Sequence, residues 1–196
     1  MKTLHVLSLA CMIAATSANA QEAPRAVRVV NEGGIRDAWT LAPGQKLAAP
    51  GYPSAYAQRG DNVCLAIGYR VQPDGTTSDF TTLHAWTSSA GGVEPESGYY
   101  DAFGQAAVAA LSEWHFTPKA GVGKPQPVDT VATVTFMSQK SAMDSKTLRA
   151  NCAVADLQSA IESALVKISS DKSMNHKNLE RKMVDQSRAD RIRTPR

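Results

Sequence analysis

The chain has 196 residues, of which 43% are hydrophobic and 20% are charged, and its formal net charge is +3. This length suits one globular domain with some tail, and this charge is too small to indicate a nucleic-acid-binding protein. Residues 172–196 hold eight Lys or Arg against three Asp or Glu, whereas residues 21–171 have a net charge of −3. We therefore expect a basic polar tail at 171–196, the segment through which contact with an anionic membrane is feasible.

Residues 1–20 have the form of a secretory signal peptide. Lys2 precedes a short apolar run, and the segment ends in the small-residue sequence ANA. The apolar run is too short to span a bilayer. Cys11 offers the alternative of a lipoprotein signal, but Ser8 stands where such signals usually carry an aliphatic residue. We expect cleavage before Gln21 and export of the mature chain.

Export would leave two cysteines, Cys64 and Cys152. An even pair in an oxidising compartment favours a disulfide, and two unrelated buried thiols are the alternative. Two cysteines are too few for a Cys-rich zinc site, and no histidine lies at ligand spacing from either of them. We expect no metal and no cofactor.

The first half of the mature chain predicts a leader and then a hairpin. Residues 21–50 are rich in Gly, Pro and Ala, and we interpret them mainly as a leader that could hold one strand at 27–30. Residues 52–60 (YPSAYAQRG) predict a short helix, with Pro53 in its first turn and Gly60 just beyond its end. Asp74-Gly75 predicts a hairpin turn between strands at 63–71 and about 77–86.

The strand at 63–71 alternates clearly, which places its side chains on two faces. The larger apolar residues share one face: Val63, Leu65, Ile67, Tyr69 and Val71. The opposite face carries Cys64, Ala66, Gly68 and Arg70. The small side chains on this second face leave room for another element to approach closely.

Two helices and a strand are predicted further along. A helix at about 101–114 has one apolar stripe, formed by Phe103, Ala107, Ala110, Leu111 and Trp114. Trp114 and Phe116 are expected to seal the junction of helix and sheet, and Pro118 prevents the helix from resuming. Residues 128–137 predict a strand, and residues 152–168 an amphipathic helix. The stripe of that helix is Val154, Leu157, Ile161, Ala164, Leu165 and Ile168.

No catalytic constellation is visible, so we do not expect an enzyme. His84 and His115 are the only histidines inside the predicted domain, and neither has a signalled partner group. The loop glycines at 91–92 and at 121 and 123 lack the strand–glycines–helix context of a phosphate-binding loop.

Five segments between residues 52 and 137 share their order and approximate spacing with one known family. They are YPSAYAQRG, VCLAIGYRVQPDGTTSD, FGQAAVAALSEWHFTP, the GKP at 123–125 and VATVTF. On these segments the chain resembles the C-terminal domain of the TonB family of periplasmic energy transducers. The residues that carry the resemblance are Tyr52, Pro53, Asp74, Gly75, Leu111, Trp114, Phe116 and Pro118. The chain departs from the family after Gly60, where members usually carry a second glycine before the first strand.

The resemblance implies an α+β fold in residues 51–138, with two helices packed on one face of a three-stranded antiparallel sheet. A helical extension at 139–170 would follow. The resemblance also implies a periplasmic location and a protein partner, because such domains bind a short motif of outer-membrane transporters as an added strand. In the family the terminal strands accept the peptide, so Val131, Thr133 and Thr135 are expected to form the docking edge. A proline at Thr133 would then weaken binding, because proline has no N–H to donate.

Two functions remain open on the sequence. A full transducer has an uncleaved membrane helix and a long Pro-rich span, and neither is visible here. The first function is a module that recognises an outer-membrane transporter; the alternative is a periplasmic scaffold or adaptor that keeps the fold without energy transduction. With either function, a bridge between Cys64 and Cys152 would place the helix at 152–168 across the small-residue face of the sheet. Without the bridge, that helix could instead bind a partner.

Overall fold

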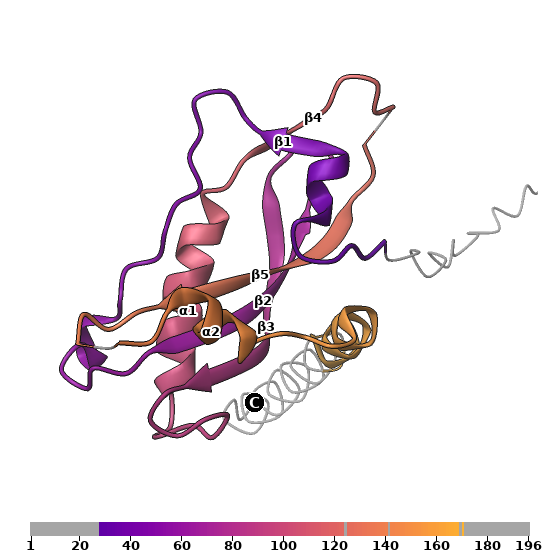
Figure 1. The fold of residues 1–196 in the computed structure, drawn as a ribbon. Coiled ribbons are helices and arrows are strands. Elements are labelled where there is room, and N and C mark those ends of the chain that lie inside the picture. Colours follow the sequence, from indigo (N-terminus) through magenta and orange to yellow (C-terminus); the bar gives the residue numbers. More distant parts are fainter. Residues whose placement is uncertain (1–27, 124, 141, 169, 171–196) are drawn as a thin grey trace, which may run out of the picture.

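The computed structural model describes residues 28–123, 125–140, 142–168 and 170. The predicted signal peptide with Cys11, the cleavage point at Gln21 and the basic tail at 171–196 lie outside these residues. The architecture is α+β, with a three-stranded antiparallel sheet at its centre (Figure 1). The sheet has the order β3-β2-β5, from β2 (Val63–Val71), β3 (Thr77–Thr87) and β5 (Val128–Phe136).

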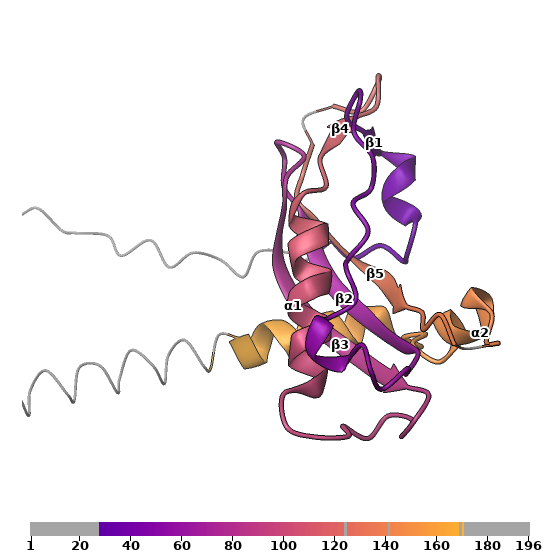
Figure 2. The same ribbon diagram turned by 90° about the vertical axis from the view of Figure 1, so that its left-hand side faces the viewer.

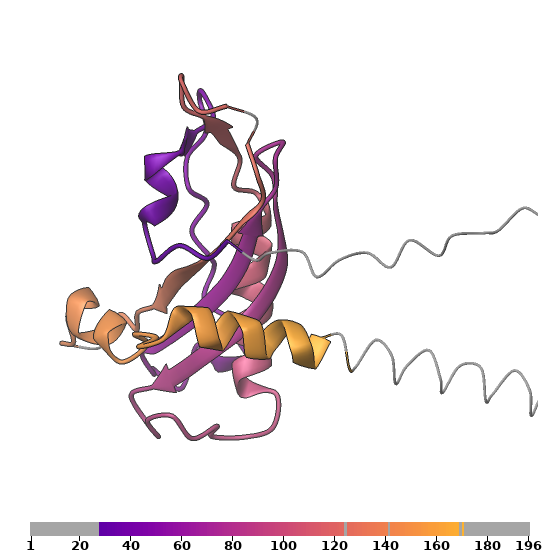
Figure 3. The same cartoon turned by 90° about the vertical axis from the view of Figure 1, so that its right-hand side faces the viewer.

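The central strand β2 has the predicted bounds and the predicted faces. Its larger apolar side chains join the main core with helix α1 (Tyr99–Ser112), whose Phe103, Ala107 and Leu111 are buried there. On its other face, Ala66 packs in a second cluster with Leu157 and Ile161. The sheet is therefore covered on both sides, by α1 and by the helical segment 157–168, which crosses the opposite face in Figure 3.

The turn between β2 and β3 forms at the predicted Asp74-Gly75. Asp74 Oδ1 accepts hydrogen bonds from both the amide and the hydroxyl of Thr76, at 3.0 and 2.7 Å. Gly75 has a φ of +86°, and its carbonyl accepts from the amide of Phe116 at 2.9 Å. The hairpin tip is thus bonded to the chain that leaves α1.

The short helix predicted at 52–60 is wrong in extent, because only a single 3-10 turn forms at Ser54–Tyr56. Aromatic packing, not a run of helical hydrogen bonds, holds this segment. The ring of Tyr52 meets that of Phe103 edge-on at 5.2 Å, and the ring of Tyr56 lies 4.7 Å from that of Tyr99. Gly60 (φ +72°) then leads the chain into β2.

Helix α1 begins and ends two residues before the predicted bounds. Gly98 takes a left-handed conformation (φ +82°) directly before it. Trp114 therefore lies outside the helix and is only partly buried. Its indole still closes the junction as expected, because the ring meets Phe116 edge-on at 6.5 Å and its N–H donates to the carbonyl of Ala48 at 3.1 Å.

The predicted leader differs most from the structure, because residues 28–48 pack on the domain. A 3-10 helix (Gly34–Asp37) leads into β1 (Trp39–Leu41), which pairs antiparallel with β4 (Phe116–Pro118). This small sheet lies at one end of the molecule (Figure 2). Trp39 is only 3% exposed and joins the main core. Strands of three residues are too short to show alternation, so the sequence does not reveal them.

The extension after the sheet has two helical parts where the sequence predicts one. Helix α2 (Ser145–Ala150) was not predicted, and Asp144 caps it by accepting from the amide of Thr147 at 2.9 Å. The second part begins at residue 157, not at 152, and Asp156 Oδ1 accepts from the amide of Ser159 at its start.

Candidate functional site

The disulfide joins the predicted pair, Cys64 of β2 and Cys152 after α2. The sulfur atoms lie 2.01 Å apart and the Cα atoms 6.0 Å apart, and neither residue is exposed. Leu148 is buried beside them, with Trp86 and Met143 partly buried against the same cluster. The bridge fastens α2 to the sheet next to β5.

Strand β5 is one edge of the sheet, and its geometry suits the addition of a further strand. It pairs with β2 over nine residues with no register shift, whereas the pairing of β2 with β3 has two shifts. At the second shift, Asp79 of β3 has a φ of +53°. Bulges of this kind disrupt an edge, so β5 is the more regular template of the two edge strands.

The N-terminal half of the β5 edge is bonded to residues 28–32, which we call the resident segment. Asp129 donates its amide to the carbonyl of Arg28 at 2.8 Å and accepts from the amide of Val30 at 2.9 Å, which makes a parallel bridge at Val29. The hydroxyl of Thr130 donates to the carbonyl of Asn31 at 3.3 Å. The resident segment therefore lies along β5 as a short added strand would.

Farther along the same edge, Thr133 contacts two charged side chains, Glu32 and Arg149. We call this pair of side chains the edge clamp. Glu32 Oε1 accepts from the Thr133 amide and Glu32 Oε2 accepts from its hydroxyl, each at 2.8 Å. Arg149 of α2 donates to the Thr133 carbonyl at 2.8 Å and to Glu32 Oε1 at 2.6 Å. A carboxylate and a guanidinium thus occupy both backbone groups of Thr133.

The predicted docking residues therefore lie on an edge, but that edge is not open. Thr133 directs its N–H outward as expected, yet Glu32 already accepts it. By alternation along the strand, Val131 and Thr135 face the same edge. Within the described residues, the bridge at Val29 is the only backbone pairing on this side of β5. The sequence gives no sign of the edge clamp, because Glu32 falls in the predicted leader and Arg149 in the predicted extension, before the helix expected at 152–168.

The residues that carry the family resemblance have structural roles. Tyr52, Leu111, Trp114 and Phe116 pack in or against the main core. Pro53 precedes the 3-10 turn, Asp74 and Gly75 form the hairpin tip, and Pro118 pairs with Trp39. These residues build the scaffold of the β5 edge, whereas the contacts of the edge clamp are made with Thr133.

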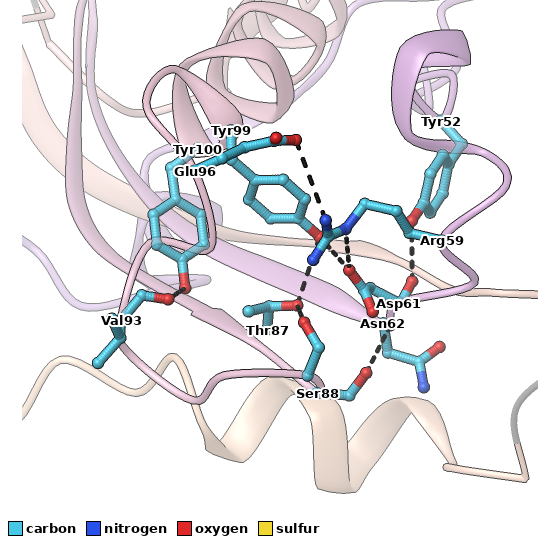
Figure 4. Close-up of polar contacts among 11 residues, drawn as sticks. Tyr52, Arg59, Asp61, Asn62, Thr87, Ser88, Val93, Glu96, Tyr99 and Tyr100 are labelled. Carbon is cyan, nitrogen blue, oxygen red and sulfur yellow. Dashed lines mark hydrogen bonds and ion pairs between the residues drawn. The ribbon is translucent and has the colours of Figure 1, made fainter.

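A second polar cluster lies around Asp61, just before β2 (Figure 4). Its Oδ2 accepts from the guanidinium of Arg59 at 2.8 Å and from the hydroxyl of Tyr99 at 2.9 Å. Tyr52 donates its hydroxyl to the Asp61 carbonyl at 3.0 Å. Burial acts to raise the pKa of Asp61, but the hydrogen bonds from Arg59 and Tyr99 outweigh it and hold the pKa below its ordinary value.

The Asp61 cluster joins two parts of the fold. The same carboxylate oxygen binds the segment before β2 and the first residue of α1, and Arg59 also lies over the Tyr99 ring at 5.2 Å from its centroid. Because this oxygen already has two donors, we assign the cluster a structural role. In the described ranges, no group of three or more His, Cys, Asp or Glu side chains could hold a metal ion.

Among the residues that the structure describes, no helix has the length and apolar character needed to cross a membrane. No family model matches the chain, and no curated protein matches it. Among solved structures, the chain is similar to the solution NMR structure of the TonB C-terminal domain of Pseudomonas aeruginosa, at 18% sequence identity and a TM-score of 0.40. The match covers 53% of this chain and 89% of that chain. A likeness at this level assigns no function to this chain.

Proposed function

We propose that this protein is a periplasmic, TonB-like protein-binding module that takes up an extended segment of a partner as an added strand on β5. The observation that carries the proposal is the regular pairing of this edge strand and the small number of contacts on its outward side. Strand β5 is regular over nine residues, and among the described residues its outward backbone groups at Asp129 and Thr133 are bonded to the resident segment and the edge clamp. An edge strand of this kind offers hydrogen-bonding groups in register to a peptide.

The present contacts are weak enough for a partner to replace. Each intramolecular hydrogen bond contributes about 0.5–1.5 kcal/mol net, and an exposed ion pair contributes about 0–1 kcal/mol. Glu32 and Arg149 have side chains that are 40% and 45% exposed. A partner strand that makes similar bonds along β5 would therefore compete with them on comparable terms.

The proposed partner is an outer-membrane transporter, the class implied by the family resemblance. The second candidate is the periplasmic scaffold or adaptor, and the occupied edge favours it, because a protein that no longer docks a strand can keep its edge closed. The identity of the proteins that a pull-down from envelope extract enriches separates the two candidates. Transporters would support the first, and cell-wall or assembly proteins would support the second.

Site-specific photo-crosslinking in cells tests the docking edge. A photoreactive residue at Thr135 on β5 is expected to capture an envelope protein, because this position faces the proposed edge. The matched control carries the same residue at Thr82 on β3, the bulged edge strand. Capture from Thr82 alone, or from neither position in a folded protein, would contradict docking on β5.

The periplasmic location is proposed from the signal-like residues 1–20 and from the cysteine pair, because disulfides persist in oxidising compartments. Mass spectrometry of protein released from the periplasm is expected to give an N-terminus at or close to Gln21. Protein retained in the inner membrane with residues 1–20 intact would contradict this proposal and favour an anchored transducer.

A further inference from the structure

We infer that the β5 edge selects a partner segment with two adjacent apolar residues and a carboxylate two positions after the second, and that Arg149 recognises this carboxylate. The inference rests on the strand addition proposed above and specifies the chemistry of the partner. The resident segment 28–32, with the sequence RVVNE, is the template for it. It shows what this edge holds when a short extended chain lies on it.

The backbone of the resident segment determines the direction of the added chain. The two hydrogen bonds around Asp129 and the bridge at Val29 are those of a parallel pairing. A partner that replaces the segment can keep these two bonds whatever its side chains are. They supply affinity for an extended chain but no selectivity among sequences.

The two valines account for the apolar part of the pattern. Successive side chains of an extended chain point to opposite sides. Val29 packs against the cluster of Ala66, Val131, Leu157 and Ile161, and Val30 packs against the main core on the α1 side. The edge therefore has an apolar contact on each side of the sheet at this point, and one residue of the partner would meet each.

The carboxylate is the selective part of the pattern. Glu32 contacts Thr133 through both of its oxygens, and the Arg149 guanidinium joins one of those oxygens to the Thr133 carbonyl. An amide in place of the carboxylate could keep its oxygen at the Oε1 position and turn its N–H₂ group to the Thr133 hydroxyl, but it would lose the negative charge that strengthens the bond from Arg149. Selection by Arg149 is therefore expected to distinguish glutamate from glutamine.

Arg149 is held ready for this contact by the fold. Its guanidinium donates to the Thr133 carbonyl independently of Glu32, and Cys152, three residues later, is bonded to β2. A cation fixed before binding loses less conformational freedom when a carboxylate arrives. The disulfide thus keeps the selective residue beside the edge.

The test uses the mature chain with its resident segment weakened by Val29→Ser and Glu32→Ala, and a fluorescent peptide that copies residues 26–34 (AVRVVNEGG). Fluorescence anisotropy is expected to show that the double variant binds this peptide about tenfold more tightly than the same peptide with glutamine in place of glutamate. Adding Arg149→Gln is expected to reduce the difference to less than about twofold, and Arg149→Lys to an intermediate value.

The outcomes separate this inference from the proposed function. Equal binding of both peptides to a folded double variant would overturn carboxylate selection and leave strand addition intact. Binding of neither peptide to that variant would overturn docking on β5 as well. Sedimentation of the wild type as a dimer, with the double variant sedimenting as a monomer, would identify a second copy of this chain as the occupant. That result would also overturn the inference.

Discussion

Removal of the Cys64–Cys152 disulfide is expected to lower the free energy of unfolding by about 4–5 kcal/mol, the loss that the chain-entropy model gives for a loop of this length. The cysteines are 88 residues apart, so the bridge greatly restricts the unfolded chain. Both cysteines are fully buried, so replacement by alanine leaves a small cavity but no buried hydroxyl group. The Cys64→Ala, Cys152→Ala variant is expected to melt roughly 10–20 °C below the wild type.

The measurement is thermal and urea unfolding of both proteins in oxidising buffer, after a non-reducing peptide map has verified the bridge. Adding a reductant should destabilise the wild type toward the double variant and leave the double variant unchanged. Free thiols in the map, or equal melting temperatures, would contradict the prediction. Because α2 carries Arg149, the double variant should also lose selectivity at the β5 edge.

The substitution Gly75→Ala is expected to destabilise the fold by about 3 kcal/mol or more, from a strained backbone and a steric clash together. Gly75 has a φ of +86°, and a Cβ atom built there would lie 1.8 Å from the carbonyl oxygen of Phe116. That carbonyl cannot move freely, because Phe116 is buried and its strand β4 pairs with β1. The hairpin tip or the chain after α1 would have to shift.

Gly121→Ala is the matched control for this clash. Gly121 has the same φ of +86°, but no atom of the described residues beyond its two chain neighbours lies within 4 Å of the position where its Cβ would be. The Gly121→Ala variant is expected to lose only the stability that the strained backbone costs, about 1–2 kcal/mol. Urea unfolding of the two variants gives the difference between their free energies of unfolding. Equal losses would show that the close approach to Phe116 is relieved at little cost.

The sequence alone determined the hairpin and favoured the pairing of the cysteines. In β2, the alternation of nine residues separates the larger apolar side chains, which join the main core, from the small ones on the opposite face, and the predicted bounds are those of the strand. Asp74-Gly75 is a local signal because its turn needs a positive φ that glycine adopts without strain. The pairing of Cys64 with Cys152 could be anticipated because no third cysteine remains after the predicted signal peptide. The packing of residues 157–168 on Ala66 followed from a helical stripe facing small side chains.

Only the tertiary structure decided which groups occupy the β5 edge. The sequence pointed to Val131, Thr133 and Thr135 as edge residues through the family resemblance. It could not show that Glu32 and Arg149, 117 residues apart, meet at Thr133. A periodic pattern reports burial along one element, whereas contacts between single side chains from distant segments leave no periodic trace. The strands β1 and β4 escaped prediction for a related reason, since three residues are too few to alternate and each strand depends on pairing with a segment distant in the sequence.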